Sequence, residues 1–200
     1  MQLINIKSRN FRCLKDVTLP VYKLTTLIGE NDSGKSSFLD LLDLVLNEKQ
    51  PDDKDFCQVG TEANCIEVEL TFKPDDIDRT VVESFVAGDG NFHVRKVFSG
   101  SSTTTYYLGQ RFVDDRLNQN FGRLKAGEFD SLLGELGIRY EGEGRLNQEI
   151  RLELIEEYKK QCEVIEDWVE VPYAKLREVL PKFVRYTALD YKDPASFVLR

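Results

Sequence analysis

The sequence is poor in the side chains that build metal centres. It has one histidine, His93, and four cysteines that form no CxxC pair: Cys13, Cys57, Cys65 and Cys162. A structural zinc site needs about four soft ligands at close spacing, so none is indicated. We expect reduced, buried thiols instead.

Long apolar runs and an excess of positive charge are also missing. No apolar segment approaches membrane-spanning length, and the opening "MQLINIKSRN" lacks the apolar stretch of a secretory signal. We therefore expect a cytoplasmic protein with no membrane partner. The net charge is −8, whereas a sequence-independent DNA binder spreads cations over a face. The small basic cluster of Lys7, Arg9, Arg12 and Lys15 fits a solvated strand edge as well as a ligand site.

What is present suits one globular domain with room for a subdomain, since 41% of the 200 residues are hydrophobic and 31% are charged. Residues 1–50 predict three strands, "LINIKS", "NFRCLKDVTLPV" and "KLTTLI", the first two as an antiparallel pair. A helix over 35–47 follows. Its broad apolar arc leaves only a narrow polar strip of Asp40, Asp43 and Asn47, which predicts a helix wedged against a sheet.

Residues 64–112 predict a β-meander. "CIEVELTF" reads as a strand, and residues 81–110 read as three more strands joined by the turns "AGDGN" and "SGSST". Residues 113–182 predict a helical subdomain, and "KFVRYTAL" predicts a core strand within 183–190. In the helical part, "FDSLLGELGI" forms a short helix, Pro172 opens another and Pro181 ends it. A stripe at helical spacing predicts one helix laid on the core, or the start of a coiled-coil arm: Leu146, Ile150, Leu154, Tyr158, Cys162 and Ile165.

The stretch "GENDSGKS" at 29–36 matches G-x-x-x-x-G-K-[ST], with an apolar segment before it and an amphipathic helix after it. Gly29 and Gly34 let backbone N–H groups approach phosphates. Lys35 supplies a cation for the β- and γ-phosphates, and the Ser36 hydroxyl is a magnesium ligand. The helix that begins at Lys35 directs the positive end of its dipole at the anion.

We therefore predict a Walker A site for ATP and Mg²⁺ from a continuous run: Gly29, Glu30, Asn31, Asp32, Ser33, Gly34, Lys35, Ser36 and Ser37. A GTPase is excluded because no DxxG or NKxD segment is found. A small-molecule kinase is the weakest alternative, because its chain usually opens with the P-loop strand itself.

The segment from "LINIKS" to "LLDLVL" resembles the N-terminus of RecF/SMC-type ATPases and is most similar to the OLD (overcoming lysogenization defect) family of ATP-dependent nucleases. The shared features are the "NFR" strand, the G-x-N-x-S-G-K-S loop and the leucine-rich helix. "TYYLGQRF", "LLGELGI" and "LPKFVRYTALD" are also similar to later parts of such heads. The resemblance implies an α/β fold, namely an ABC-type P-loop ATPase head lobe that has a mixed sheet, an antiparallel β-meander and flanking helices.

The resemblance also implies roles outside the loop. Arg12 would lie near the nucleotide, although a surface charge at a strand end is an equal reading. Asn31 would help to hold the γ-phosphate side. Gln148 and Gln110 are candidates for the glutamine that senses magnesium, and each is also readable as an ordinary surface residue.

Hydrolysis needs a Walker B strand that ends in Asp with a Glu beside it, and a signature helix. "VIED" at 164–167 lies in the helical stripe, and "YTALD" at 186–190 lacks the glutamate. "FSGSS" at 98–102 sits in a hairpin turn, and "DDID" at 75–78 reads as a turn rather than a Toprim metal cluster. No catalytic residue is therefore identified.

We expect residues 1–200 to be an incomplete N-terminal lobe that binds ATP and hydrolyses it weakly or not at all. The rest of its chain or a partner would supply the missing parts, and the partner can be a second copy in a homodimer. The full form would control a DNA nuclease of the anti-phage defence type. The alternatives are a RecF/SMC-like DNA repair ATPase lobe and a non-catalytic P-loop interaction module.

Overall fold

The computed structural model describes residues 1–57, 65–76, 78–100, 102–142 and 146–186. The chain forms two compact units, one of Met1–Leu108 with Trp168–Arg200 and one of Gly109–Asp167. The fold is mixed α/β, as expected, with helices beside an antiparallel sheet.

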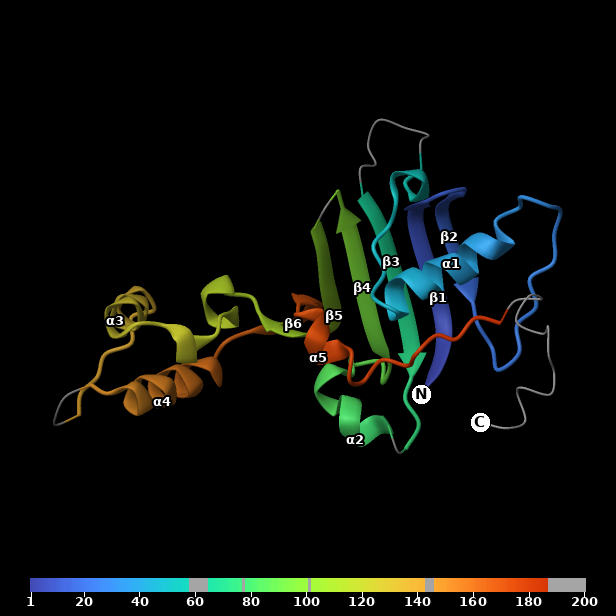
Figure 1. Cartoon of the computed structure of the whole chain (residues 1–200). Helices are drawn as coiled ribbons and strands as arrows, with labels where there is room; N and C mark the ends of the chain where they lie inside the picture. Colours follow the sequence, from blue (N-terminus) through green and yellow to red (C-terminus); the bar gives the residue numbers. More distant parts are fainter. Residues whose placement is uncertain (58–64, 77, 101, 143–145, 187–200) are drawn as a thin grey trace, which may run out of the picture. The chain divides into compact units, whose positions relative to one another are not determined.

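The sheet has six strands in the order β2-β1-β3-β4-β5-β6 (Figure 1). Their bounds are β1 Gln2–Phe11, β2 Leu14–Pro20, β3 Cys65–Lys73, β4 Phe92–Ser99, β5 Ser102–Phe112 and β6 Val164–Glu170. The predicted pairing of the first two strands is confirmed, with Ile6 opposite Leu19. β3, β4 and β5 make the predicted meander. β4 and β5 pair as the predicted hairpin, with Ser99 opposite Ser102, and Gly100 has φ +55°.

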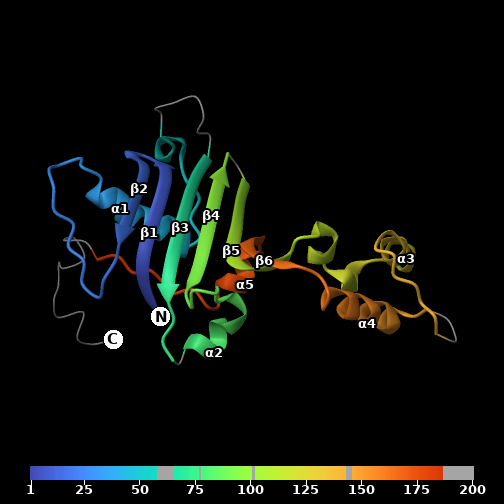
Figure 2. The same ribbon diagram turned by 180° about the vertical axis from the view of Figure 1, so that it is seen from behind.

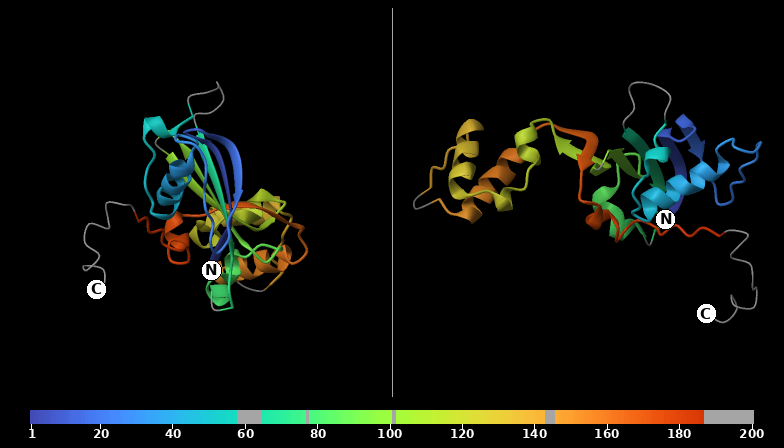
Figure 3. Two further views of the ribbon diagram at one scale, coloured as in Figure 1. Left: turned by 90° about the vertical axis from the view of Figure 1, so that its right-hand side faces the viewer. Right: turned by 45° about the horizontal axis from the view of Figure 1, so that its top comes forward.

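One face of the sheet carries the core of the first unit. Alternate residues of β3 and β4 are buried, among them Val68, Phe72 and Phe98, as the two-residue period of a half-buried strand requires. Helix α1, Lys35–Leu46, lies across this face and buries Leu41 and Val45 against it (Figures 1, 2 and 3). The predicted helix over 35–47 is confirmed to within a residue.

The opposite face of the sheet is polar. The Glu69 carboxylate on β3 accepts from Arg95 Nη2 on β4 at 2.7 Å and lies 3.9 Å from Lys7 Nζ on β1. The Arg95 guanidinium also stacks 4.0 Å from the ring centre of Trp168. Lys7 and Arg95 on this face are thus paired with the Glu69 carboxylate across neighbouring strands.

The strand predicted over 23–28 is wrong. These residues form no strand, and Leu24 and Ile28 are 87% and 90% exposed. A strand is stable only when its N–H and C=O groups pair with a neighbour. Within the described residues no segment pairs with this one.

The strand predicted over "VVESFV" is also wrong. Helix α2, Asp78–Val82, and a 3₁₀ turn, Glu83–Phe85, occupy this segment. The helical turn buries Val82, and it brings the Phe85 ring edge-on to Tyr107 at 5.1 Å. Burial of these apolar side chains outweighs the strand preference of the sequence.

The second unit has its own core around α3, Ala126–Glu135, and α4, Gln148–Lys159. Its buried apolar residues are Leu117, Phe121, Phe129, Leu132, Leu133, Leu136 and Ile155. Arg151 Nε of α4 donates to Asp130 Oδ1 of α3 at 2.7 Å. The unit ends at Asp167, earlier than the expected boundary at 182, because Val171, Leu176 and Leu180 pack into the core of the first unit.

The predicted stripe is only partly helical. α4 ends at Lys159, so Cys162 follows the helix and Ile165 stands on β6, where it is 42% exposed. The fully buried residue of α4 is Ile155, one position after the stripe. The apolar spacing in the sequence continues past Lys159, but the helix ends there and the chain turns into strand β6.

Pro172 precedes α5, Tyr173–Leu176, as predicted. The strand predicted over 183–190 is not formed at 183–186, and residues 187–190 lie outside the described part. Here the backbone follows α1 instead, because the Phe183 carbonyl accepts from Asn47 Nδ2 at 2.9 Å and Arg185 pairs with Asp40.

The four thiols are free, as expected, but only Cys57 is buried, and Cys13 is exposed. Cys65 and Cys162 are half-buried, so the expectation of buried thiols is confirmed for Cys57 alone and is wrong for Cys13. In the part of the chain that the structure describes, no helix has the length and apolar character needed to cross a membrane.

Candidate nucleotide-binding site

The loop of residues 29–34 ends where α1 begins, and Gly34 makes the junction. Its φ of +92° is left-handed, a conformation that glycine adopts without strain. A Cβ at this position would lie 2.9 Å from Cys13 Sγ and 3.2 Å from Leu14 Cδ2. Both the backbone angle and the close approach of β2 therefore require glycine here.

Lys35 folds back over the loop. Its Nζ donates to the carbonyl oxygens of Gly29 and Glu30, at 2.8 and 2.5 Å, and lies 3.3 Å from Ser33 Oγ. A Cβ on Gly29 would come within 2.7 Å of Ser33 Oγ, so the loop closes tightly. The ammonium is thus held at the loop, where it can exchange a carbonyl partner for an anionic oxygen.

A pocket of about 540 Å³ opens at the N-terminus of α1. Its lining residues come from the loop, the first turn of the helix and the β1–β2 turn: Arg12, Asn31, Asp32, Gly34, Lys35, Ser36 and Ser37. The first turn of α1 carries no acidic residue. The unpaired N–H groups and the dipole of a 12-residue helix therefore favour an anion in this pocket.

The donor set fits a magnesium ion only together with a phosphate ligand. Ser36 is exposed at the pocket, whereas Ser37 is buried, with its Oγ 3.8 Å from Cys13 Sγ. Among the described residues, no group of three or more His, Cys, Asp or Glu side chains could hold a metal. A magnesium ion at Ser36 would take its other ligands from phosphate oxygens and water.

Arg12 lines the same pocket. Its backbone has φ +51°, and its N–H donates to the Asp55 carbonyl at 2.7 Å. The guanidinium donates through Nε to Asp55 Oδ1 at 2.8 Å and through Nη1 to Asp40, which also pairs with Arg185. These partners could not be predicted from the sequence, because Asp40 stands in the polar strip of α1 and Asp55 lies 43 residues from Arg12.

These pairs set the protonation of the cluster. Burial disfavours the charged guanidinium, but hydrogen bonds to Asp55 and Asp40 outweigh it and raise the pKa of Arg12. Burial likewise favours the neutral form of Asp40, yet the hydrogen bonds from Arg12 and Arg185 lower its pKa below the usual value. Arg12 and Asp40 therefore both carry their charges at neutral pH.

Gln148 and Gln110 belong to the second unit. Gln148 Nε2 donates to the Phe121 carbonyl at 3.4 Å, which is a local structural contact, and Gln110 is exposed on β5. The structure gives neither residue a local arrangement that would sense a metal.

Neither "VIED" nor "DDID" forms a catalytic arrangement in the part of the chain that the structure describes. "VIED" lies on edge strand β6 rather than in a helix, with Val164 and Ile165 each 42% exposed, whereas a Walker B strand is apolar and buried. Within "DDID", Asp75 Oδ1 accepts from the Asp78 N–H at 2.8 Å, as a turn requires. Apart from Tyr186, "YTALD" lies outside the described residues.

Comparison with known proteins defines the class. The chain matches the AAA ATPase domain family over residues 1–180 and belongs to it. This membership implies use of a nucleotide, typically with Mg²⁺.

A particular relative is the OLD nuclease of Thermus scotoductus, which is 36% identical to this chain over 78 residues. The match covers 36% of this chain and 15% of the Thermus protein. The predicted resemblance to the N-terminal ATPase part of the OLD family is thus confirmed.

Proposed function

We propose that this chain is the ATP-binding lobe of an OLD-like ATPase, and that residues 29–37 with Arg12 bind Mg·ATP. The observation that carries the proposal is the arrangement of Lys35 and Gly34. The ammonium is held over a closed glycine loop, and the left-handed Gly34 starts a helix at the mouth of a pocket. This is the arrangement that a polyphosphate needs.

Each residue has a task in this proposal. Backbone N–H groups of the loop and the first turn of α1 bind the phosphates, and Lys35 adds a cation between the β- and γ-phosphates. Ser36 offers its hydroxyl to Mg²⁺, which when bound neutralises phosphate charge. Asn31 lines the γ-phosphate side. Arg12 reaches a phosphate from the pocket wall by exchanging its bond to Asp40.

We propose that the fold is one lobe of an ABC-type head and that catalysis needs groups from outside the described residues. The support is the exposure of "VIED" on an edge strand, which leaves no buried Walker B strand among the described residues. The rest of the natural chain or a second copy would provide the catalytic carboxylate and the signature segment. This piece alone then binds ATP without brisk turnover.

We propose that the full form couples nucleotide state to a DNA nuclease, as the name of the Thermus relative suggests. A Toprim domain encoded downstream would agree with this role and with anti-phage defence. A long coiled coil in that position would point instead to a RecF/SMC-like repair ATPase.

Calorimetric titration with Mg·ATP tests the binding proposal, with phosphate release followed in the same samples. We expect the wild type and the exposed control Lys15→Ala to bind, and Lys35→Ala to lose binding. Equal binding by Lys35→Ala would overturn the proposed site. Brisk phosphate release by the wild type would overturn the need for outside catalytic groups.

A further inference from the structure

The C-terminal end of α1 is held by groups that come from outside the helix. The last four carbonyls of any helix lack an intrahelical partner. In α1, two of these carbonyls are served by the chain that follows: Asp43 accepts from the Asn47 N–H and Leu44 accepts from the Lys49 N–H, each at 3.1 Å. The last turn contains no basic residue that could serve the other two.

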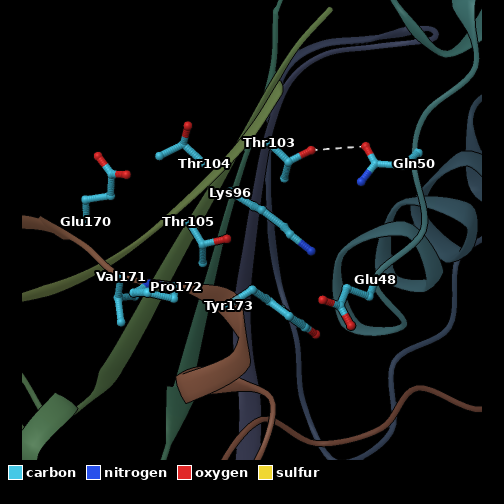
Figure 4. Close-up of a pocket in the computed structure, with 10 residues that line it drawn as sticks. All are labelled: Glu48, Gln50, Lys96, Thr103, Thr104, Thr105, Glu170, Val171, Pro172 and Tyr173. Atoms are coloured by element: carbon cyan, nitrogen blue, oxygen red, sulfur yellow. Dashed lines mark hydrogen bonds between the residues drawn. The ribbon is translucent and has the colours of Figure 1, made fainter. Parts of the chain in front are cut away.

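The remaining carbonyls are served by two side chains from distant parts of the first unit. Lys96 Nζ, on β4, donates to the Val45 carbonyl at 3.2 Å. Tyr173 Oη, at the start of α5, donates to the Leu46 carbonyl at 3.1 Å. Figure 4 shows both side chains pointing toward this end of the helix, beside Glu48. All four terminal carbonyls are therefore satisfied.

Lys96 is unusual for a helix-capping cation because it is buried in the core. Its residue is 2% exposed, and its ammonium lies 4.0 Å from the centre of the Tyr173 ring. Burial of a lysine carries a desolvation cost, of which the carbonyl, the aromatic face and the negative end of the helix dipole offset only a part. The same side chains line a pocket of about 470 Å³ with Glu48, Gln50 and Thr103 (Figure 4).

We propose that Lys96 and Tyr173 are positioning residues for the phosphate loop. They fix one end of the 12-residue helix whose other end forms the anion pocket, about 18 Å away. A helix moves as a rigid element. Increased mobility at its C-terminal end therefore displaces Gly34 and the first-turn N–H groups relative to β1 and β2. This inference rests on the proposed nucleotide site.

The decisive variant is Lys96→Ala, because it removes a propylamine-sized group beside an open pocket. We expect Mg·ATP affinity to fall about threefold to tenfold, with faster amide hydrogen exchange over residues 41–49. Added propylamine restores both, whereas 1-propanol, which has the same shape without the charge, does not. Tyr173→Phe shows the same changes to a smaller degree, and Lys15→Ala, the exposed control of the titration above, matches the wild type.

Two results would overturn the proposal. One is unchanged affinity and exchange in both Lys96→Ala and Tyr173→Phe. The other is equal rescue by 1-propanol, which would show that filled volume rather than charge is what matters. If Lys96→Ala does not fold, Lys96→Met keeps the stem and carries the same affinity and exchange tests. Failure of the proposed function appears separately, as Lys35→Ala binding ATP like the wild type, and amide exchange still decides whether Lys96 holds the helix end.

Discussion

The buried ammonium of Lys96 should make the stability of this protein rise with pH above neutrality. Burial lowers the pKa of Lys96 from its ordinary 10.5 to about 8, and the negative charge of Glu48 partly opposes this shift. Between these two values the unfolded chain keeps the proton that the folded chain has lost. Since the unfolded state then binds more protons, the free energy of unfolding increases with pH across this window.

The magnitude follows from the two pKa values. They differ by about 2.5 pH units, and one unit corresponds to about 1.4 kcal/mol, so the full effect is about 3 kcal/mol. Relative to pH 7, Lys96 should add about 1 kcal/mol at pH 9 and about 2–3 kcal/mol at pH 10.

Urea unfolding of the wild type and of Lys96→Met, followed by circular dichroism at pH 7, 8, 9 and 10, isolates this contribution. The other groups titrate in both proteins, so the difference between the two unfolding free energies reports Lys96. Tyr173 and Glu48 face the ammonium, and the Tyr173 pKa is raised by burial, so the series stops at pH 10. Unfolding free energies that stay parallel from pH 7 to pH 10 would refute the reasoning.

Three further predictions concern the loop, the core and the ion cluster. Gly34→Ala should cost about 1–3 kcal/mol in thermal unfolding and weaken Mg·ATP binding, because it combines a positive φ with a clash. Gly90→Ala, with φ +79° and no atom within 4 Å of the new Cβ, should cost only about 1 kcal/mol and leave binding intact. Leu41→Ala, at a fully buried site of α1, should cost about 2–5 kcal/mol in urea unfolding, whereas Leu39→Ala at the partly exposed face should cost far less; equal losses would contradict the packing described. Asp40→Asn should cost about 1 kcal/mol at pH 7. Because the pKa of Asp40 is lowered in the folded state, its stabilisation is present above the ordinary value of 3.8 and is lost as pH falls through the folded value. A difference in unfolding free energy between wild type and Asp40→Asn that persists at the lowest pH would argue against the ion pairs.

Local pattern determined the elements whose causes lie within a few residues. The spacing of the apolar residues placed α1, alternation placed β1, and strand-forming runs between turn signals placed β3, β4 and β5. The G-x-x-x-x-G-K-S spacing placed the loop, because glycine and lysine are needed at those positions for reasons of backbone geometry and charge. These features needed no knowledge of distant contacts.

Tertiary structure decided what depends on partners far along the chain. Residues 23–28 have strand-like composition but no neighbour to pair with, so they are not a strand among the described residues. Residues 78–85 are helical because this conformation buries Val82 and brings the Phe85 ring against Phe92 and Tyr107 of the sheet. The links from Arg12 to Asp55 and from Lys96 to the end of α1 span 43 and 51 residues. Such pairings depend on how the chain folds back on itself, which no local sequence period encodes.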